Sequence, residues 1–134
     1  MANNMTKELS LSLRIPADKE YLENVILTLD GVCEHCNIDA HNSEKIRNAL
    51  FTVLTRNIAI IPEYNKALFE LNFGVIQDNI NITIENYFIN ETEKVNNELK
   101  NIKSHLEFIY KLADNAKIIK VLNDKLIYSI QFNI

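Results

Sequence analysis

Four side chains with metal-binding chemistry lie close together in this chain: Cys33, His35, Cys36 and His41. Structural zinc sites use such thiolates and imidazoles, usually as a C-x2-C pair followed by H-x3-5-H. The spacing here is C-x-H-C-x4-H, and on a helix His35 would point about 160° away from Cys33 and about 100° away from Cys36. A closed tetrahedral site would require the helix to end before Cys36. We therefore expect no metal site. Cys33 and Cys36 are the only weak candidates for metal ligands. The alternative is that both are buried thiols near a helix end.

Glycine is nearly missing from the chain, which contains only Gly31 and Gly74 among 134 residues. At its usual frequency of ~7%, glycine would occur about nine times in a chain of this length. Phosphate-binding loops and dinucleotide turns need several residues whose backbone can approach phosphate or adopt positive φ. In addition, no Ser or Cys lies in a strand-to-helix elbow that would suit a catalytic nucleophile. The glycine content therefore excludes enzymes with phosphate-binding loops or dinucleotide turns, and nucleophilic catalysis has little support in the sequence.

The charge of the chain also limits its partners. The net charge is −4 and the isoelectric point is about 5.4, with no basic run, so we expect no nucleic-acid partner. No apolar stretch approaches the ~20 residues of a membrane span. Residues 1–10 have neither the charged nor the apolar region of a signal peptide, so we expect a cytoplasmic protein with no membrane partner. One domain should cover residues 1–134.

Hydrophobic spacing predicts the elements that must position these side chains. Alternation over residues 8–15 predicts a half-buried strand. Apolar residues spaced by three and four predict amphipathic helices over 17–36 and 43–61, with Ser43 as the N-cap of the second. A hairpin follows, with strands at 67–75 and 80–85. After it come a helix at 92–113 and a second hairpin with strands at 116–122 and 126–134.

The resulting order, βααββαββ, predicts an α+β protein. The simplest packing is a two-layer α/β sandwich, in which three helices cover one face of a five-stranded, mostly antiparallel sheet. The apolar stripe at 95–113 would pack on this sheet or, alternatively, offer a surface to a partner helix. The first strand should lie at a sheet edge, where it could pair with another chain or be covered by residues 1–7.

Four strings, together with this order, resemble a known family. They are IPADKEYLENVILTLDGV at 15–32, EKIRNALFTVLTRNIAI at 44–60, FELNFGVIQDNINITIEN at 69–86 and LEFIYKLADNAKIIKVLNDKLIYSIQF at 106–132. Over nearly its whole length the chain resembles the anti-sigma factor serine kinases of bacterial partner-switching systems, members of the GHKL (histidine kinase-like) ATPase superfamily. The resemblance implies the sandwich of the histidine-kinase ATPase (Bergerat) type.

The family's helix motif, E-x-x-x-N, supplies a general base and a magnesium ligand. Aligned without a gap, these positions fall on Thr52 and Arg56. Threonine cannot take up a proton near neutral pH, and a guanidinium cation does not coordinate Mg²⁺. A shift of one residue would bring Asn57 to the metal position but would turn the helix by about 100°. Either Arg56 binds phosphate directly in a remodelled site, or ordinary side chains fill a lapsed one.

The other two motifs of the family also depart from its pattern. In D-x-G-x-G, the adenine-binding Asp corresponds to Asn86 and the first Gly to Phe88, whose ring would occupy space that adenine needs. The glycine run that wraps the phosphates falls near Lys103 and His105, where the apolar stripe predicts helix in place of a mobile lid. His105 fits a boundary residue of that helix better than a phospho-acceptor.

We therefore expect a degenerate domain without catalytic residues or a bound cofactor, which acts by protein–protein binding. The resemblance implies a sigma factor or a small anti-anti-sigma-type antagonist as the partner, and a homodimer as in the family. Regulation would then depend on competition between partners rather than on phosphorylation. The alternative is a divergent serine kinase that still binds ATP and Mg²⁺.

Overall fold

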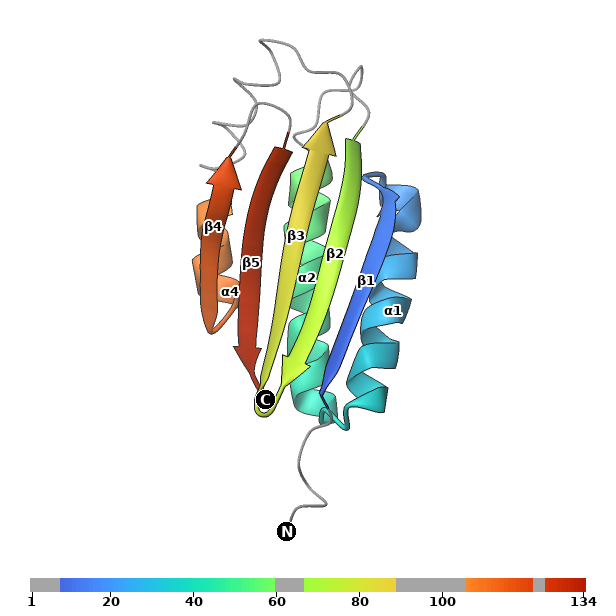
Figure 1. Cartoon of the computed structure of the whole chain (residues 1–134), viewed down its shortest axis with the longest axis vertical. Coiled ribbons are helices and arrows are strands. Elements are labelled where there is room, and N and C mark those ends of the chain that lie inside the picture. Colours follow the sequence, from blue (N-terminus) through green and yellow to red (C-terminus); the bar gives the residue numbers. More distant parts are fainter. Residues whose placement is uncertain (1–7, 60–66, 89–105, 122–124) are drawn as a thin grey trace.

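A five-stranded sheet with helices on one face forms the fold of the computed structural model, which describes residues 8–59, 67–88, 106–121 and 125–134 (Figure 1). In chain order the elements are β1 (Leu9–Pro16), the 3-10 turn η2 (Lys19–Tyr21), α1 (Leu22–His35), α2 (Ala40–Ala59), β2 (Ala67–Ile76), β3 (Asn79–Phe88), the 3-10 turn η3 (Leu106–Phe108), α4 (Ile109–Leu112), β4 (Asn115–Val121) and β5 (Lys125–Asn133). The strand order is β1-β2-β3-β5-β4, and all neighbours are antiparallel. The predicted α+β class and sheet are confirmed.

The alternation of apolar residues decides which face of the sheet the helices cover. Side chains of successive strand residues point to opposite faces, so every second residue meets the helices. The buried positions of the two strands with the clearest pattern are Ala67, Phe69, Leu71, Phe73 and Val75 in β2 and Leu126, Tyr128, Ile130 and Phe132 in β5. The residues between them lie on the open face, which is turned toward the viewer in Figure 1.

Helices α1 and α2 close the core from the other side. Their buried residues are Leu22, Val25, Leu29, Val32 and Cys33 in α1, and Ile46, Ala49, Leu50, Val53, Leu54 and Asn57 in α2. Full burial of a Val, Leu or Ile side chain contributes about 1.5–3 kcal/mol, so these two apolar stripes supply much of the driving force for folding. None of the helices in the described part of the chain has the length and apolarity to cross a bilayer.

The first turn of α2 differs from the prediction. The helix begins at Ala40, and the Oδ1 atom of Asp39 accepts the backbone N–H of Asn42 at 2.8 Å. Asp39 is therefore the N-cap, and this hydrogen bond is the main reason that the pKa of its carboxyl lies below the ordinary value. The prediction of Ser43 as the cap is wrong, because Asp39 provides a cap oxygen one turn earlier. The Ser43 hydroxyl instead donates to the Ile38 carbonyl at 3.3 Å.

Only the end of the helix predicted over 92–113 lies within the described residues. There the chain forms the 3-10 turn η3 and then the single-turn α4, so an unbroken α-helix through this stretch is wrong. Ala113 is already extended, at φ −117° and ψ 160°, because the chain turns into β4. The backbone N–H of Asp114 then donates to the carbonyl of Gln131 at 3.0 Å.

Both predicted hairpins are present. Gln77 and Asp78 connect β2 to β3, and Gln77 takes a positive φ of 52°, as the first residue of a tight two-residue turn requires. Strands β4 and β5 pair with a register shift between Ile118 and Lys120. The turn predicted at Asn123 lies outside the described residues.

Candidate functional site

The two helix positions that the resemblance aligns with the family's base and metal ligand, Thr52 and Arg56, both make contacts within the fold. The Thr52 hydroxyl donates to the carbonyl of Asn48, one turn earlier in α2, at 2.8 Å. The guanidinium of Arg56 lies 4.2 Å from the centre of the Phe108 ring, close enough for a cation–π contact. Arg56 is exposed on the surface of α2. Neither residue offers a group that could take a proton from an attacking hydroxyl.

A buried chain of polar side chains joins α2 to the sheet near the end of that helix. Asn57 is fully buried, and its Nδ2 atom donates to the hydroxyl of Tyr128 in β5 at 2.7 Å. The Nδ2 atom of Asn86 in β3 donates to the Oδ1 atom of Asn57, also at 2.7 Å. These three residues, here called the Asn57 network, link one helix to two neighbouring strands. Because each bond is shielded from water, it is worth more than at the surface.

One atom of the Asn57 network has no partner among the described residues. The Oδ1 atom of Asn86 is buried and accepts no hydrogen bond. Such an atom costs about 1–3 kcal/mol unless a donor reaches it, so the position suits a small N–H or O–H donor. Burial raises the pKa of the Tyr128 hydroxyl, and the bond from Asn57 opposes this only in part. Tyr128 therefore stays protonated and neutral across the physiological range.

The structure brings together only some of the residues singled out in the sequence. It places Asn86 beside Asn57, the residue that a one-position shift would bring to the metal position, while Arg56 points elsewhere. Phe88 ends β3 opposite Ala67. The two remaining candidates, Lys103 and His105, lie outside the described residues. Asn57 follows the buried apolar residues of α2 at the same spacing of three and four positions. This spacing was the sequence signal for its burial.

The two cysteines lie at the end of α1 and are both buried thiols. Burial is the main reason that the pKa of Cys33 is raised, and a hydrogen bond with Ser43 lowers it in part. A raised pKa leaves little of the thiolate that nucleophilic attack or metal binding requires. His35 and His41 are exposed. Across the described stretches, no three His, Cys, Asp or Glu side chains come close enough to hold a metal ion.

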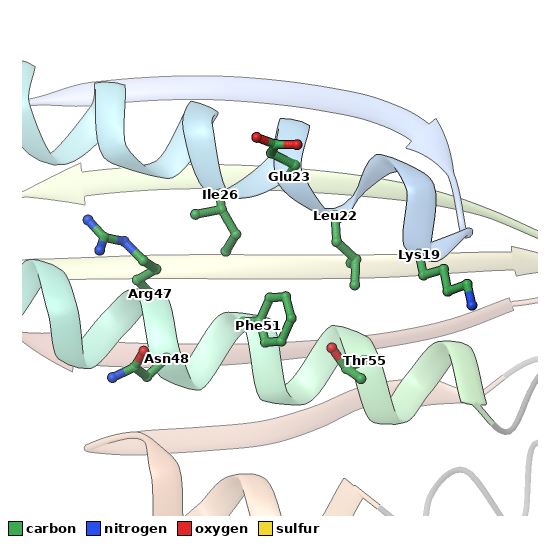
Figure 2. A pocket seen from close by; sticks show the side chains of 8 residues that line it. All are labelled: Lys19, Leu22, Glu23, Ile26, Arg47, Asn48, Phe51 and Thr55. Carbon is green, nitrogen blue, oxygen red and sulfur yellow. The ribbon is translucent and has the colours of Figure 1, made fainter.

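An apolar groove of about 560 Å³ runs between α1 and α2 on the outside of the helix layer (Figure 2). It is lined by Lys19, Leu22, Glu23, Ile26, Arg47, Asn48, Phe51 and Thr55. Leu22 and Ile26 point from α1 toward Phe51, which rises from α2. The Phe51 side chain is 48% exposed, although its ring is large and apolar. Sequence reasoning missed this groove because it depends on how the two helices pack.

An ion pair crosses from one helix to the other beside the groove. A terminal nitrogen of the Arg47 guanidinium lies 2.9 Å from the Oδ1 atom of Asp30, and its Nε atom donates to the same oxygen at 3.0 Å. Both side chains are partly exposed, so the pair contributes at most about 1 kcal/mol. The ion pair also holds the Arg47 guanidinium at the rim of the groove. Arg47 therefore does not cover the apolar side chains around Phe51.

No protein-family model matches this sequence, and no curated protein matches it. The side chains themselves therefore have to indicate a function. Two features of the helix layer bear on it: the buried Asn57 network under α2 and the groove on the outside of the helices.

Proposed function

We propose that this chain is a regulatory domain that acts by binding other proteins and that it neither transfers phosphate nor binds ATP. We assign its sandwich to the histidine-kinase ATPase (Bergerat) type on the strength of the sequence strings and the order of elements. One observation carries the functional proposal. The described side chains at the nucleotide positions of that family bond within the fold: Thr52 to its own helix, Arg56 to Phe108 and Asn86 to Asn57.

The chemistry of these residues supports the absence of phosphoryl transfer. Such transfer relies on a positioned base and on a metal ion that neutralises the phosphate charge. A Thr hydroxyl at position 52 cannot act as the base, and the cation of Arg56 does not fit Mg²⁺. The residues present therefore do not fit a magnesium-bound nucleotide of the usual kind.

The groove supports the binding part of the proposal. Protein interfaces often centre on an aromatic residue in an apolar depression with a polar rim. Phe51 stands in such a position, with Leu22 and Ile26 beside it and Lys19 and Arg47 at the rim. An amphipathic helix with apolar residues three and four apart fits a groove between two helices. By resemblance, a sigma factor or an anti-anti-sigma-type antagonist would provide it.

A nucleotide titration tests the first half of the proposal. We expect neither Mg-ATP nor Mg-ADP to change the melting temperature or to give a calorimetric signal. A ligand with a Kd of 1 μM would stabilise the fold by about 2.7 kcal/mol at 100 μM, which a thermal shift detects easily. Magnesium chloride alone is the control. A saturable shift with nucleotide would overturn the pseudoenzyme assignment.

Affinity capture from a bacterial lysate with two matched variants tests the second half. Phe51→Ser removes the aromatic ring from the groove, whereas Leu27→Ser removes an exposed apolar side chain of α1 that does not line it. We expect the wild-type chain and Leu27→Ser to retain the same protein and Phe51→Ser to lose it. Capture of neither a sigma factor nor an antagonist-type protein, or equal capture by both variants, would count against the assignment.

A divergent ATP-binding kinase is the second candidate, and one observation favours it. The unpartnered Oδ1 atom of Asn86 lies at the residue that the resemblance aligns with the adenine-binding Asp, and an adenine amino group is a suitable donor for it. If this candidate is correct, Asn86→Leu should abolish any nucleotide-induced shift, while Thr52→Ala should leave binding intact.

A further inference from the structure

A small polar hollow of about 90 Å³ lies across β3, β5 and β4. Its lining residues are Asn81, Asn115, Ala116, Lys117, Ser129 and Gln131. The three strands lie side by side in Figure 1, and the alternation of their side chains puts Asn81, Ser129 and Gln131 on the face opposite the helices. The hollow is therefore separate from both the groove and the Asn57 network, and its ligand is independent of the proposed function.

The strand register explains why a hollow forms at this place. Two rows of residues cross the three strands: Asn81, Gln131 and Asn115 form one, and Thr83, Ser129 and Lys117 form the next. Residues in one row have Cβ atoms about 4.5–5.5 Å apart, so longer side chains rise around a shorter one. Ser129 is the shortest in its row and forms the floor. It is only 4% exposed, although it belongs to the open face of the sheet.

The lining of the hollow is rich in hydrogen-bond donors and has a single formal charge. The ammonium of Lys117 is that charge, and no carboxylate lines the hollow. The Ser129 hydroxyl and the amides of Asn81 and Asn115 can all donate. The amide nitrogen of Gln131 is already engaged, since it donates to the Oδ1 atom of Asn79 at 3.0 Å. An anionic oxygen ligand would thus meet donors from three strands.

Acidic groups near the hollow are engaged elsewhere. Glu85 lies one row beyond Thr83 on the open face, where its carboxylate accepts the hydroxyl of Tyr87. Asp114 precedes β4, and its carboxylate accepts the backbone N–H of Asn133 at 2.8 Å and contacts the Lys45 ammonium at 3.2 Å. Neither carboxylate lines the hollow, so the local field there is set by Lys117.

We propose that this hollow binds a phosphoryl group. A tetrahedral oxyanion presents three or more acceptor oxygens, which matches donors converging from three strands better than the two oxygens of a carboxylate do. The volume equals roughly that of three water molecules in the liquid, at about 30 Å³ each, and so leaves space for one such group. The hollow opens to solvent, so the phosphoryl group can belong to free phosphate or to a monoester.

An NMR titration of the full-length ¹⁵N-labelled chain with inorganic phosphate at constant ionic strength tests the proposal. We expect saturable shifts of the amides at 81, 115–117 and 129–131, with none in α1. Lys117→Met should weaken binding about tenfold or more, as expected for the loss of a charged hydrogen-bond donor. Lys125→Met is the matched control, because this lysine lies on the same face but stacks on Tyr87 at 5.0 Å from the ring centre.

A second variant and two further ligands complete the test. Ser129→Val fills the floor of the hollow without changing the charge, and we expect it to abolish the shifts. Binding of methyl phosphate as tight as that of phosphate would indicate a phosphoryl group on a larger molecule, and exclusion of the ester would indicate the free ion. Shifts that never saturate, equal affinity in Lys117→Met, or acetate binding as tightly as phosphate would each overturn the proposal.

Discussion

The two ends of α2 meet the same sheet with opposite chemistry. Between its start and its midpoint, the helix buries Ile46, Ala49 and Leu50, which are apolar and fully or almost fully buried. Near its end, it buries Asn57, which bonds to Asn86 and Tyr128. Apolar contacts tolerate many arrangements of similar volume, whereas hydrogen bonds require particular distances and angles. The first end therefore contributes mainly to stability, and the second fixes the position of the helix relative to the strands.

The comparison also has a functional side. Under the proposed assignment, the polar end of α2 corresponds to the region where the histidine kinase-like family contacts its nucleotide and metal. In this chain the amides at that end bond to each other and to a tyrosine, which leaves one acceptor, the Oδ1 atom of Asn86, without a partner among the described residues. Under that assignment, polar groups that face a ligand in the family instead form hydrogen bonds that hold this fold together.

The largest effect should come from the apolar end. Leu50 is completely buried, and Leu50→Ala removes several methyl and methylene groups from a packed core. We expect a loss of about 3–5 kcal/mol in the free energy of unfolding, measured by urea denaturation. Its neighbour Phe51 lies half exposed in the groove, so Phe51→Ala should cost clearly less. Equal losses for the two variants would contradict the packing described for this end.

A smaller but still substantial effect is expected from the polar end. Asn57→Ala leaves the Asn86 amide and the Tyr128 hydroxyl without their shared partner, at a cost of about 2–3 kcal/mol. In a double-mutant cycle with Asn86→Ala, the two losses should fall short of additivity by about 0.5–3 kcal/mol. Strict additivity in urea denaturation would show that the two amides do not interact.

Loss of the tyrosine hydroxyl should have a lesser effect. Tyr128→Phe keeps the ring in the core and removes the acceptor of the Asn57 amide, so we expect a loss of about 1–2 kcal/mol. Tyr87→Phe is the matched control on the open face, where the hydroxyl bonds to Glu85 near solvent. This variant should change the free energy of unfolding by less than about 0.5 kcal/mol. The reverse order would contradict the burial of the network.

The smallest effect should be a dependence of stability on pH that arises from Asp39, the N-cap of α2. The hydrogen bond from Asn42 holds the pKa of Asp39 below its ordinary 3.8, so the folded state favours the charged carboxylate. The resulting stability is present above pH 3.8 and is lost as the pH falls through the lower, folded-state pKa. Asp39→Asn keeps a capping oxygen but cannot titrate. Its urea midpoint should therefore fall less between pH 7 and pH 3 than that of the wild type.

The elements of this fold were predictable because they depend on local spacing. The alternation in β2 and β5 and the helical spacing in α1 require no knowledge of distant residues, and the structure agrees with them. The start of α2 was predicted wrongly because Asp39 and Ser43 are both good N-caps and lie one turn apart. Local preference alone could not choose between them.

The candidate site was less predictable because its contacts are long-range. Asn57 meets Asn86 and Tyr128 across 29 and 71 positions of sequence, and spacing within one helix cannot reveal such partners. The same holds for Arg56, whose ring contact is with Phe108. The groove depends on the approach of α1 to α2, and the hollow on the register of three strands. The sequence showed which side chains could do chemistry, but only the fold shows which of them contact each other.

The place of β1 in the sheet has a consequence for synthesis on the ribosome. Among the described strands β1 pairs with β2 alone, and this pairing joins Leu9 to Val75 and Pro16 to Leu68. At about 5–20 residues per second, the first strand emerges roughly 3–12 s before its partner. Both hairpins, in contrast, can close as soon as they are made. In a nascent chain β1 therefore stays unpaired until β2 has been made, and the sheet is complete only once β5 pairs with β3 and β4.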